Sequence, residues 1–212
     1  MGIQPELLKG IEGLGFTEAT PIQQEIIPLV FDTENDIVGL AQTGTGKTAA
    51  FGLPLIQNTD MDDPSVQTLI LAPTRELCIQ IASDLKLYTK YVPKFNIVPV
   101  YGGAAIDTQI RSLKKGAHII VATPGRMVDL LNRKVAKLGN IRNVVLDEAD
   151  EMLNMGFRDE LNTILDKTPQ DKRVLLFSAT MPNEVAKIAS TYMDNPVRKT
   201  VGKQNQGAEN IK

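Results

Sequence analysis

The residues best suited to do chemistry form one octapeptide, Ala-Gln-Thr-Gly-Thr-Gly-Lys-Thr, at positions 41 to 48. Gly44 and Gly46 allow a turn tight enough for successive backbone N–H groups to point at phosphate oxygens. Lys47 can then reach the β- and γ-phosphates of a bound nucleotide, and the hydroxyl of Thr48 can ligate Mg²⁺. The octapeptide therefore predicts a triphosphate cradle to which all its residues contribute: Ala41, Gln42, Thr43, Gly44, Thr45, Gly46, Lys47 and Thr48.

This cradle departs from the usual pattern at one position. Ala41 stands where the first glycine is common, and its methyl group is the smallest side chain that could be tolerated there. The alternative interpretation is a glycine-rich turn between a strand and a helix that binds no ligand.

A second group of reactive side chains is the run Asp147-Glu148-Ala149-Asp150, which follows the apolar segment Asn143–Leu146. Carboxylates beside a polyphosphate would be repelled unless a Mg²⁺ ion lay between them, so Asp147 is expected to hold that ion directly or through water. Glu148 can orient and deprotonate the attacking water. Lys47, Asp147 and Glu148 are thus the expected catalytic residues. The alternative is an acidic helix N-terminus stabilised by the helix dipole.

Near the N-terminus, Thr20-Pro21-Ile22-Gln23 allows two interpretations. Thr20 suits a helix N-cap, Pro21 the first helical position, and Gln23 the reciprocal position of a capping box. The carboxamide of Gln23 could instead accept from N6 and donate to N7 of an adenine. The local sequence favours neither interpretation.

The elements that must position these groups follow a regular alternation. Apolar runs, each followed by a helical stretch, occur at 68–72, 97–101, 119–122, 144–146 and 174–177, after the run at 36–40 that precedes the cradle. This alternation predicts an α/β fold with a mostly parallel sheet covered by helices on both faces. An amphipathic helix is predicted over residues 5–14. Ligands of such sheets gather at the carboxyl ends of the strands, where every candidate residue lies.

The composition narrows the kind of protein. The 212 residues are 42% hydrophobic and carry a net charge of −2, so any nucleic acid must be held by local contacts. No apolar run is long enough for a bilayer, and residues 1–5 lack a signal-peptide pattern, so we expect a cytoplasmic protein without a membrane partner. The single cysteine, Cys78, and the single histidine, His118, are expected to be structural.

Taken together, these motifs resemble those of the N-terminal RecA-like domain of DEAD-box ATP-dependent RNA helicases. The run Asp147–Asp150 matches the box that names the family, and residues 15–23 resemble its adenine-reading Q motif. The resemblance extends from about Gly15 to Thr180, with order and spacing that agree throughout. It includes the segments Pro73–Leu77, Gly102-Gly103, Thr123–Arg126 and Ser178–Thr180.

The resemblance implies roles for these residues. Gln23 would read adenine, with Thr20 and Phe16 beside it. The carboxyl-end segments would hold the sugar-phosphate backbone of RNA through Pro73, Thr74, Arg75, Gly102, Gly103, Thr123, Pro124, Gly125 and Arg126. Backbone N–H groups at helix starts are ready phosphate donors, which fits this role. Asp150, Ser178 and Thr180 would link hydrolysis to strand separation.

The resemblance also sets the expected organisation. Residues 1–35 would hold helices of the same domain, 36–201 the RecA-like P-loop NTPase core, and 202–212 the start of a linker. The expected function is ATP and Mg²⁺ binding by half of a monomeric RNA helicase. The second RecA-like domain, which supplies transition-state arginines in this family, has no counterpart here, so this piece should be nearly inactive alone. The alternatives are a nucleotide-binding module without activity and the motor domain of another P-loop ATPase, such as a DNA helicase.

Overall fold

A computed structural model describes residues 1–202 of the chain as an α/β domain. Its strands are β1 Ile37–Leu40, β2 Thr68–Leu71, β3 Ile97–Val100, β4 Ile119–Ala122, β5 Asn143–Leu146, β6 Arg173–Ser178 and β7 Val197–Thr200. Its helices are α1 Pro5–Glu12, α2 Pro21–Asp32, α3 Lys47–Gln57, α4 Arg75–Tyr88, α5 Ile106–Lys114, α6 Pro124–Asn132, α7 Ala149–Asn154, α8 Arg158–Asp166 and α9 Asn183–Tyr192.

These strands form one sheet in the order β3-β4-β2-β5-β6-β1-β7. Every strand pair is parallel, so the carboxyl ends of all seven strands meet at one edge of the sheet. The predicted RecA-like α/β fold with a mostly parallel sheet is confirmed. We call this edge the carboxyl edge.

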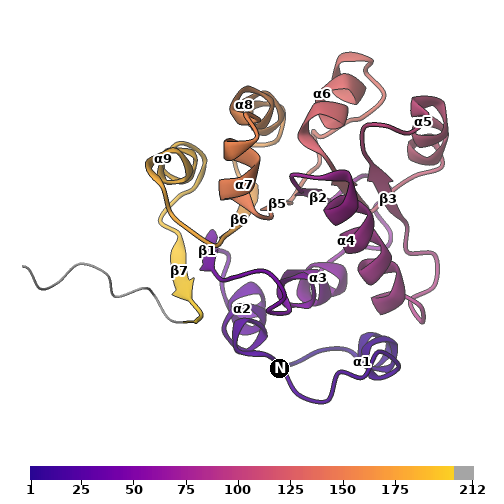
Figure 1. Cartoon of the computed structure of the whole chain (residues 1–212). Helices are drawn as coiled ribbons and strands as arrows, with labels where there is room; N and C mark the ends of the chain where they lie inside the picture. Colours follow the sequence, from indigo (N-terminus) through magenta and orange to yellow (C-terminus); the bar gives the residue numbers. More distant parts are fainter. Residues whose placement is uncertain (203–212) are drawn as a thin grey trace, which may run out of the picture.

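Helices cover the sheet on both faces, as Figure 1 shows. Helices α1 to α4 lie on one face, where apolar side chains such as Ile26, Phe51 and Ile81 form one core layer. Helices α5 to α9 lie on the other face, where Met127, Leu161 and others form the second layer. Because the central strands are buried on both faces, their sequences are continuous apolar runs rather than alternating ones.

Two central strands meet at an unusually close contact. Gly39 of β1 lies beside Phe177 of β6, and a Cβ atom at position 39 would come within 2.7 Å of the phenyl ring. Phe177 cannot move aside, because its ring is fully buried and packs on Phe51 at a centroid distance of 5.4 Å. The absence of a side chain at position 39 is therefore what lets these two strands pair.

The structure differs from the sequence-based predictions at the chain ends. Strand β7 was not predicted. It lies at the edge of the sheet, where its residues Val-Arg-Lys-Thr alternate between half-buried and exposed, and an alternation over only four residues is too short to identify a strand. Helix α1 is shorter than predicted and passes into a turn after Glu12. Most of the predicted linker, residues 203–212, lies outside the described residues, and the division of the chain at residue 35 stays a prediction.

Two predictions made from single residues are confirmed. Cys78 is a buried thiol whose Sγ donates to the carbonyl of Val121 at 3.2 Å, and burial raises its pKa to about 12. His118 is structural, since its Nδ1 accepts from the Asn96 N–H at 3.0 Å. Within residues 1–202, every helix is too short or too polar to cross a membrane.

Candidate functional site

The predicted phosphate cradle connects β1 to α3 at the carboxyl edge. Gly44 and Gly46 have φ values of 74° and 86°, in the left-handed region that glycine adopts readily. The hydroxyl of Thr45 donates to the carbonyl of Gln42 at 2.7 Å and closes the turn. Helix α3 begins at Lys47, so its N-terminal N–H groups face the loop. The geometry suits a bound anion.

Ala41, the departure from the usual pattern, is buried in the core at 3% exposure. Its N–H donates to the carbonyl of Ser178 at 3.1 Å, which continues the pairing of β1 with β6. The methyl group therefore packs inward and does not obstruct the cradle.

Lys47 and Asp147 form a buried ion pair, although 100 positions separate them in the chain. Their Nζ and Oδ1 atoms are 3.3 Å apart, and the side chains are 7% and 3% exposed. Burial raises the pKa of the Asp147 carboxyl, and the nearby Lys47 ammonium opposes that rise. The strands β1 and β5 that deliver the two residues are separated by one strand, β6. The sequence-based expectation that these groups lie together is correct.

Glu148 lies next to this ion pair with a backbone φ of 52°, which is unusual for a residue with a side chain. Its N–H donates to Asp147 Oδ1 at 3.0 Å. Burial raises the pKa of the Glu148 carboxyl, and the Asp147 carboxylate raises it further. A carboxylate with a raised pKa is a stronger proton acceptor, which suits a general base.

The oxygen donors near the cradle fit a Mg²⁺ ion only in part. Thr48 in the first turn of α3 and Asp147 offer the hard oxygen ligands that Mg²⁺ prefers. Within residues 1–202, no group of three or more acidic, cysteine or histidine side chains could hold a metal. Such a site fits an ion that takes its remaining ligands from phosphate oxygens and water.

Gln23 connects the N-terminal motif to the phosphate cradle. Its Oε1 accepts from the Thr20 N–H at 2.9 Å, so the glutamine half of the predicted capping box is formed. Its Nε2 donates to the carbonyl of Gly46 at 3.2 Å. A Cβ at position 46 would lie 2.6 Å from that Nε2 atom. Gln23 therefore packs directly on the cradle at 4% exposure.

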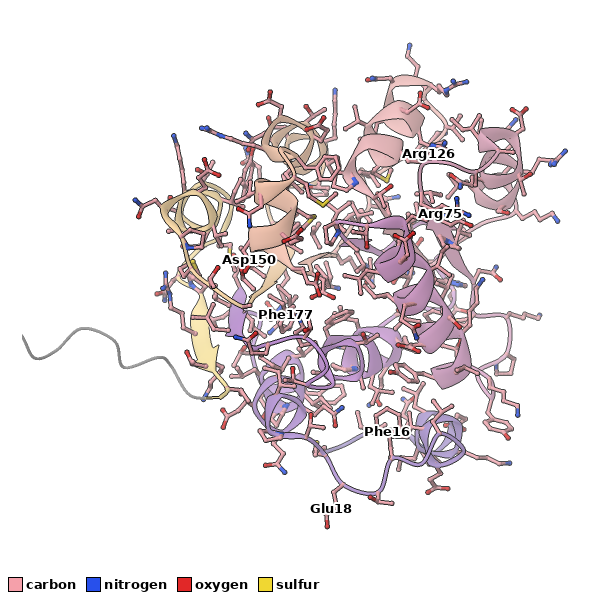
Figure 2. All side chains as sticks on the ribbon, viewed as in Figure 1. Phe16, Glu18, Arg75, Arg126, Asp150 and Phe177 are labelled. Carbon is pink, nitrogen blue, oxygen red and sulfur yellow. The ribbon has the colours of Figure 1, made fainter. Side chains whose placement is uncertain are left out.

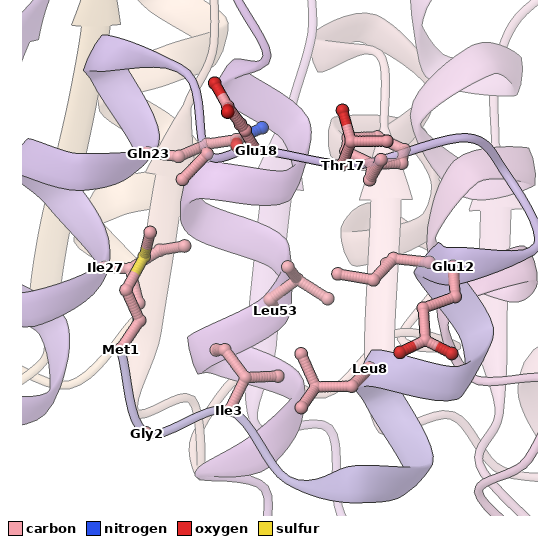
Figure 3. Close-up of a pocket in the computed structure, with 13 residues that line it drawn as sticks. Met1, Gly2, Ile3, Leu8, Glu12, Thr17, Glu18, Gln23, Ile27 and Leu53 are labelled. Carbon is pink, nitrogen blue, oxygen red and sulfur yellow. The ribbon is translucent and has the colours of Figure 1, made fainter.

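A cavity of about 390 Å³ opens beside Gln23, within the size range of ligand pockets. Figure 3 shows Gln23 and Glu18 at one end of it, Leu53 in the middle, and Ile3 and Leu8 at the other end. The sequence did not identify Leu53, Ile3 and Leu8 as pocket residues, because their spacing is that of ordinary core positions.

Of two further predicted residues, one lines this cavity and the other, Thr20, lies beside Gly46 of the cradle. Phe16 lines it and packs edge-to-face on Tyr88 with ring centroids 6.3 Å apart. The Thr20 hydroxyl is buried and has no hydrogen-bond partner in the described part of the chain. A buried polar atom left in this way fits a site that a ligand or water completes.

Asp150, Ser178 and Thr180 are hydrogen-bonded to one another, as expected. Asp150 Oδ2 accepts from the Thr180 hydroxyl at 2.9 Å and from the Thr180 N–H at 3.2 Å. The Asp150 N–H donates to Ser178 Oγ at 3.2 Å. This cluster links the acidic run at the start of α7 to the end of β6, the strand that pairs with β1.

The predicted RNA-binding segments follow β2, β3 and β4 along the carboxyl edge. Pro73 and Thr74 precede α4, whose N-cap Thr74 accepts from the Leu77 N–H at 3.1 Å. Thr123 and Pro124 begin α6, and Gly102, Gly103 and Gly125 are exposed. The structure thus brings these segments together in what we call the RNA edge.

The two arginines of the RNA edge make contacts within the protein that the sequence did not reveal, and their role in RNA binding stays a prediction. Arg75 Nη1 donates to the carbonyl of Gly103 at 3.3 Å, and its guanidinium lies 5.2 Å from the ring centre of Tyr101. Arg126 donates from both Nη atoms to the carbonyl of Ala104 at 3.2 Å. Figure 2 shows the two arginines near each other and apart from Asp150. Both side chains hold the loop that follows β3.

Gln109 of α5 completes this arrangement, and no sequence pattern pointed to it. Its Oε1 accepts from Arg126 Nη1 at 2.9 Å and from the Tyr101 N–H at 3.3 Å, while its Nε2 donates to the Tyr101 carbonyl at 3.1 Å. The side chain is 6% exposed. We call Arg75, Gln109 and Arg126 the loop clamp. One glutamine within a short helix carries no local signal of such a role.

Comparison with known proteins agrees with this geometry. Residues 20–188 match the family model described as DEAD/DEAH box helicase. The chain is 52% identical over 196 residues to the DEAD-box ATP-dependent RNA helicase CshA of Bacillus cereus, and 51% identical over 197 residues to the CshA helicase of Listeria monocytogenes. Each comparison covers 92% of this chain and 37% of the relative, so the chain spans little more than a third of these relatives' length.

Solved structures show the same relationship. A DEAD box protein from the hyperthermophile Methanococcus jannaschii superposes with a TM-score of 0.89 and 43% identity, over 94% of this chain and 54% of that one. An ATP-dependent RNA helicase from Sulfolobus tokodaii, described as hypothetical, gives a TM-score of 0.86 and 34% identity, over 94% and 57%. The chain belongs to the DEAD/DEAH box helicase family.

Proposed function

We propose that this chain is the N-terminal ATP- and RNA-binding domain of an RNA helicase that couples ATP hydrolysis to local opening of RNA duplexes. The observation that carries the proposal is the convergence of the cradle, the acidic run and the RNA edge at one edge of a single sheet. The relatives named as ATP-dependent RNA helicases support the same function.

For the nucleotide, the cradle residues from Ala41 to Thr48 bind the phosphates through backbone N–H groups, and Lys47 turns from Asp147 toward the terminal phosphates. Gln23 reads the adenine with its carboxamide, Phe16 lines the adjoining cavity, and Thr20 lies beside Gly46 of the cradle. The exposed Gln42, Thr43 and Gly44 leave the phosphate side of the loop open to the ligand.

For hydrolysis, Glu148 accepts the proton of the attacking water, and its raised pKa makes it a better acceptor. Thr48 and Asp147 would hold a Mg²⁺ ion, which when bound neutralises phosphate charge. The ion pair between Lys47 and Asp147 holds both side chains in position until a nucleotide arrives.

For RNA, the backbone N–H groups at the starts of α4 and α6, together with the loop after β3, contact the sugar-phosphate chain. The residues concerned are Pro73, Thr74, Arg75, Gly102, Gly103, Thr123, Pro124, Gly125 and Arg126. Asp150, Ser178 and Thr180 lie between this edge and the nucleotide and couple one to the other. A second RecA-like domain in the full-length protein supplies the arginines that complete the active site.

We also propose that the full-length protein works as a cytoplasmic monomer. Its ligands are soluble, and the site described above needs no second copy of this chain.

The test is RNA-stimulated ATP hydrolysis and duplex separation by the full-length protein, compared with the 212-residue chain alone. We expect turnover with RNA, little turnover with DNA of the same sequence, and weak nucleotide binding without turnover by the single domain. Equal stimulation by DNA would favour a DNA helicase. RNA-stimulated turnover by the single domain would contradict the requirement for a second domain.

A further inference from the structure

The segment from Arg111 to Lys137 differs in charge from the rest of the chain. It contains seven basic residues against the single acidic residue Asp129, a net charge of +6, whereas the whole chain has a net charge of −2. Its basic residues are Arg111, Lys114, Lys115, Arg126, Arg133, Lys134 and Lys137. Of these, the loop clamp uses only Arg126. The remaining six cations have no part in the proposed nucleotide and RNA contacts.

Four of these cations surround one hollow. A groove of about 790 Å³ is lined by Pro64–Val66, by the end of α5 and by the loop after α6. Its basic lining residues are Lys114, Arg133, Lys134 and Lys137, all exposed. Between them lie apolar side chains that include Val66, Leu113 and Val135. We call this hollow the basic groove.

Few acidic groups near the basic groove neutralise it. Asp129 pairs with Arg133 at 2.9 Å. Asp63, next to the Pro64 rim, is occupied by Arg142 at 3.1 Å and by the Ser65 hydroxyl. In the described part of the chain, no salt bridge engages Lys114, Lys134 or Lys137. The side chains of these three lysines are therefore available to a ligand.

Helices α5 and α6 connect the basic groove to the RNA edge. Both helices begin at the carboxyl edge, next to Gly103 and Thr123, and both end at the groove, which lies near the amino ends of β2, β4 and β5. A nine-residue helix is about 14 Å long, so the two sites are a short strand of RNA apart. Figure 2 shows nitrogen-ended side chains that project outward around these helices.

We propose that an RNA strand leaving the RNA edge continues along α5 and α6 and places its phosphates against the lysines of the basic groove. This inference rests on the proposed RNA-binding function. Phosphate contacts of this kind carry most of nucleic-acid affinity and no sequence information. Among residues 1–202, no aromatic side chain lines the groove, so it offers no platform for base stacking. The groove therefore lengthens the RNA footprint without selecting a sequence.

Two alternative roles for the basic groove lead to different predictions. Lys114, Arg133 and Lys134 lie at helix C-termini, where positive charge is stabilising, so their role could be confined to folding stability. An acidic protein segment with apolar side chains could use the floor of the groove. Continuity with the RNA edge favours RNA over such a segment.

The experiment measures the affinity of the chain for fluorescent oligouridylate strands of about 6 and about 16 nucleotides. The short strand fills the RNA edge alone, and the long strand can also reach the groove. We expect the long strand to bind about tenfold more tightly. The variant Lys114→Gln/Lys134→Gln/Lys137→Gln should lose this preference and keep its affinity for the short strand. Its slope of log affinity against log salt with the long strand should fall by about 2.

A matched control removes the same charge elsewhere. Lys86→Gln/Lys94→Gln/Lys187→Gln changes three exposed lysines outside the groove. The two sets are similar in backbone as well, since Lys94 and Lys134 both have left-handed φ values, of 60° and 57°. The control should keep the preference for the long strand. Thermal unfolding of both variants shows whether either is misfolded.

Several results would overturn the proposal. If the wild-type chain binds the short strand but shows no preference for the long one, the proposed RNA contact at the basic groove is wrong, whereas RNA binding at the RNA edge is retained. If the triple variant unfolds at a lower temperature yet keeps the preference for the long strand, the role of the three lysines is limited to stabilising the helices. Binding of an alternating Glu-Leu peptide at the groove, without any RNA length effect, would assign it to a protein segment. If wild type binds neither strand, the RNA edge itself fails.

Discussion

The nucleotide end and the RNA end of the carboxyl edge are built in opposite ways. At the nucleotide end, side chains meet side chains in a buried setting, as in the pair of Lys47 and Asp147. At the RNA end, side chains hold backbone carbonyls of an exposed loop, as Arg75 and Arg126 do. Under the proposed function, chemistry at the first end would depend on particular functional groups, whereas binding at the second would depend on backbone shape. Substitutions should therefore change turnover at one end and affinity at the other.

The largest expected effect is at Glu148, in the full-length protein. Glu148→Gln should bind ATP nearly as wild type and lower kcat by about 10²- to 10⁴-fold, because the amide can hold a water but cannot accept its proton. Steady-state hydrolysis and equilibrium ATP binding check this. Glu151→Gln, which changes an exposed acid three residues away, is the control and should retain turnover. Near-normal hydrolysis by Glu148→Gln would remove it from the role of base.

The loop clamp gives the next effect. Gln109→Ala should raise the KM for RNA about tenfold and leave kcat at saturating RNA nearly unchanged, because the variant loosens the loop without touching the nucleotide. Gln109→Glu keeps the acceptor for Arg126 and should recover part of the loss. The exposed Gln80→Ala serves as the control. A fall in kcat with constant KM would break the distinction between the two ends.

A comparable effect is expected at Gln23, which touches both the cavity and the cradle. Gln23→Ala should reduce the preference for ATP over GTP about tenfold, since a carboxamide that pairs with adenine at two atoms discriminates at that level. Competition binding of the two nucleotides measures it. The neighbouring Gln24→Ala, whose amide only bonds the Ala19 carbonyl, should behave as wild type. If Gln23→Ala kept the same selectivity for ATP over GTP, the role of Gln23 would be helix capping rather than adenine recognition.

The smallest effect should come from the cluster of Asp150, Ser178 and Thr180, which lies between the nucleotide end and the RNA end. Thr180→Val removes one hydrogen bond to Asp150, so duplex separation per ATP hydrolysed should fall about threefold while ATP hydrolysis stays close to wild type. Parallel unwinding and ATPase assays check this ratio, with the exposed Thr191→Val as the control. If both activities fell together, Thr180 would belong to the nucleotide end.

The sequence predicted the nucleotide end better than the RNA end, and the reason is physical. Parallel strands bring their carboxyl ends to one edge, so the meeting of Lys47 with Asp147 and of Asp150 with Thr180 followed from the strand pattern alone. The loop clamp depends on where three separate helices point their side chains, which no local pattern encodes. For the same reason, Gln109 was missed, and the contact of Arg75 with the loop after β3 was not predicted.

The fold itself was predictable wherever strands are buried on both faces, because such strands are continuous apolar runs. Strand β7 escaped because it lies at the edge of the sheet, next to β1 alone, and its alternation over four residues is too short to distinguish from a loop. The cavity beside Gln23 was not predicted, because apolar residues such as Leu53 have the same sequence pattern in a cavity wall as in a closed core.

The contact between Gly39 and Phe177 has an evolutionary consequence. Every amino acid other than glycine adds a Cβ that would overlap a ring held fast in the core, so position 39 has almost no accessible substitutions. In a library of all single substitutions selected for function, we expect this position to tolerate as few substitutions as Lys47, although its role is packing alone. Position 39 would accept a new residue only after a smaller side chain had appeared at position 177.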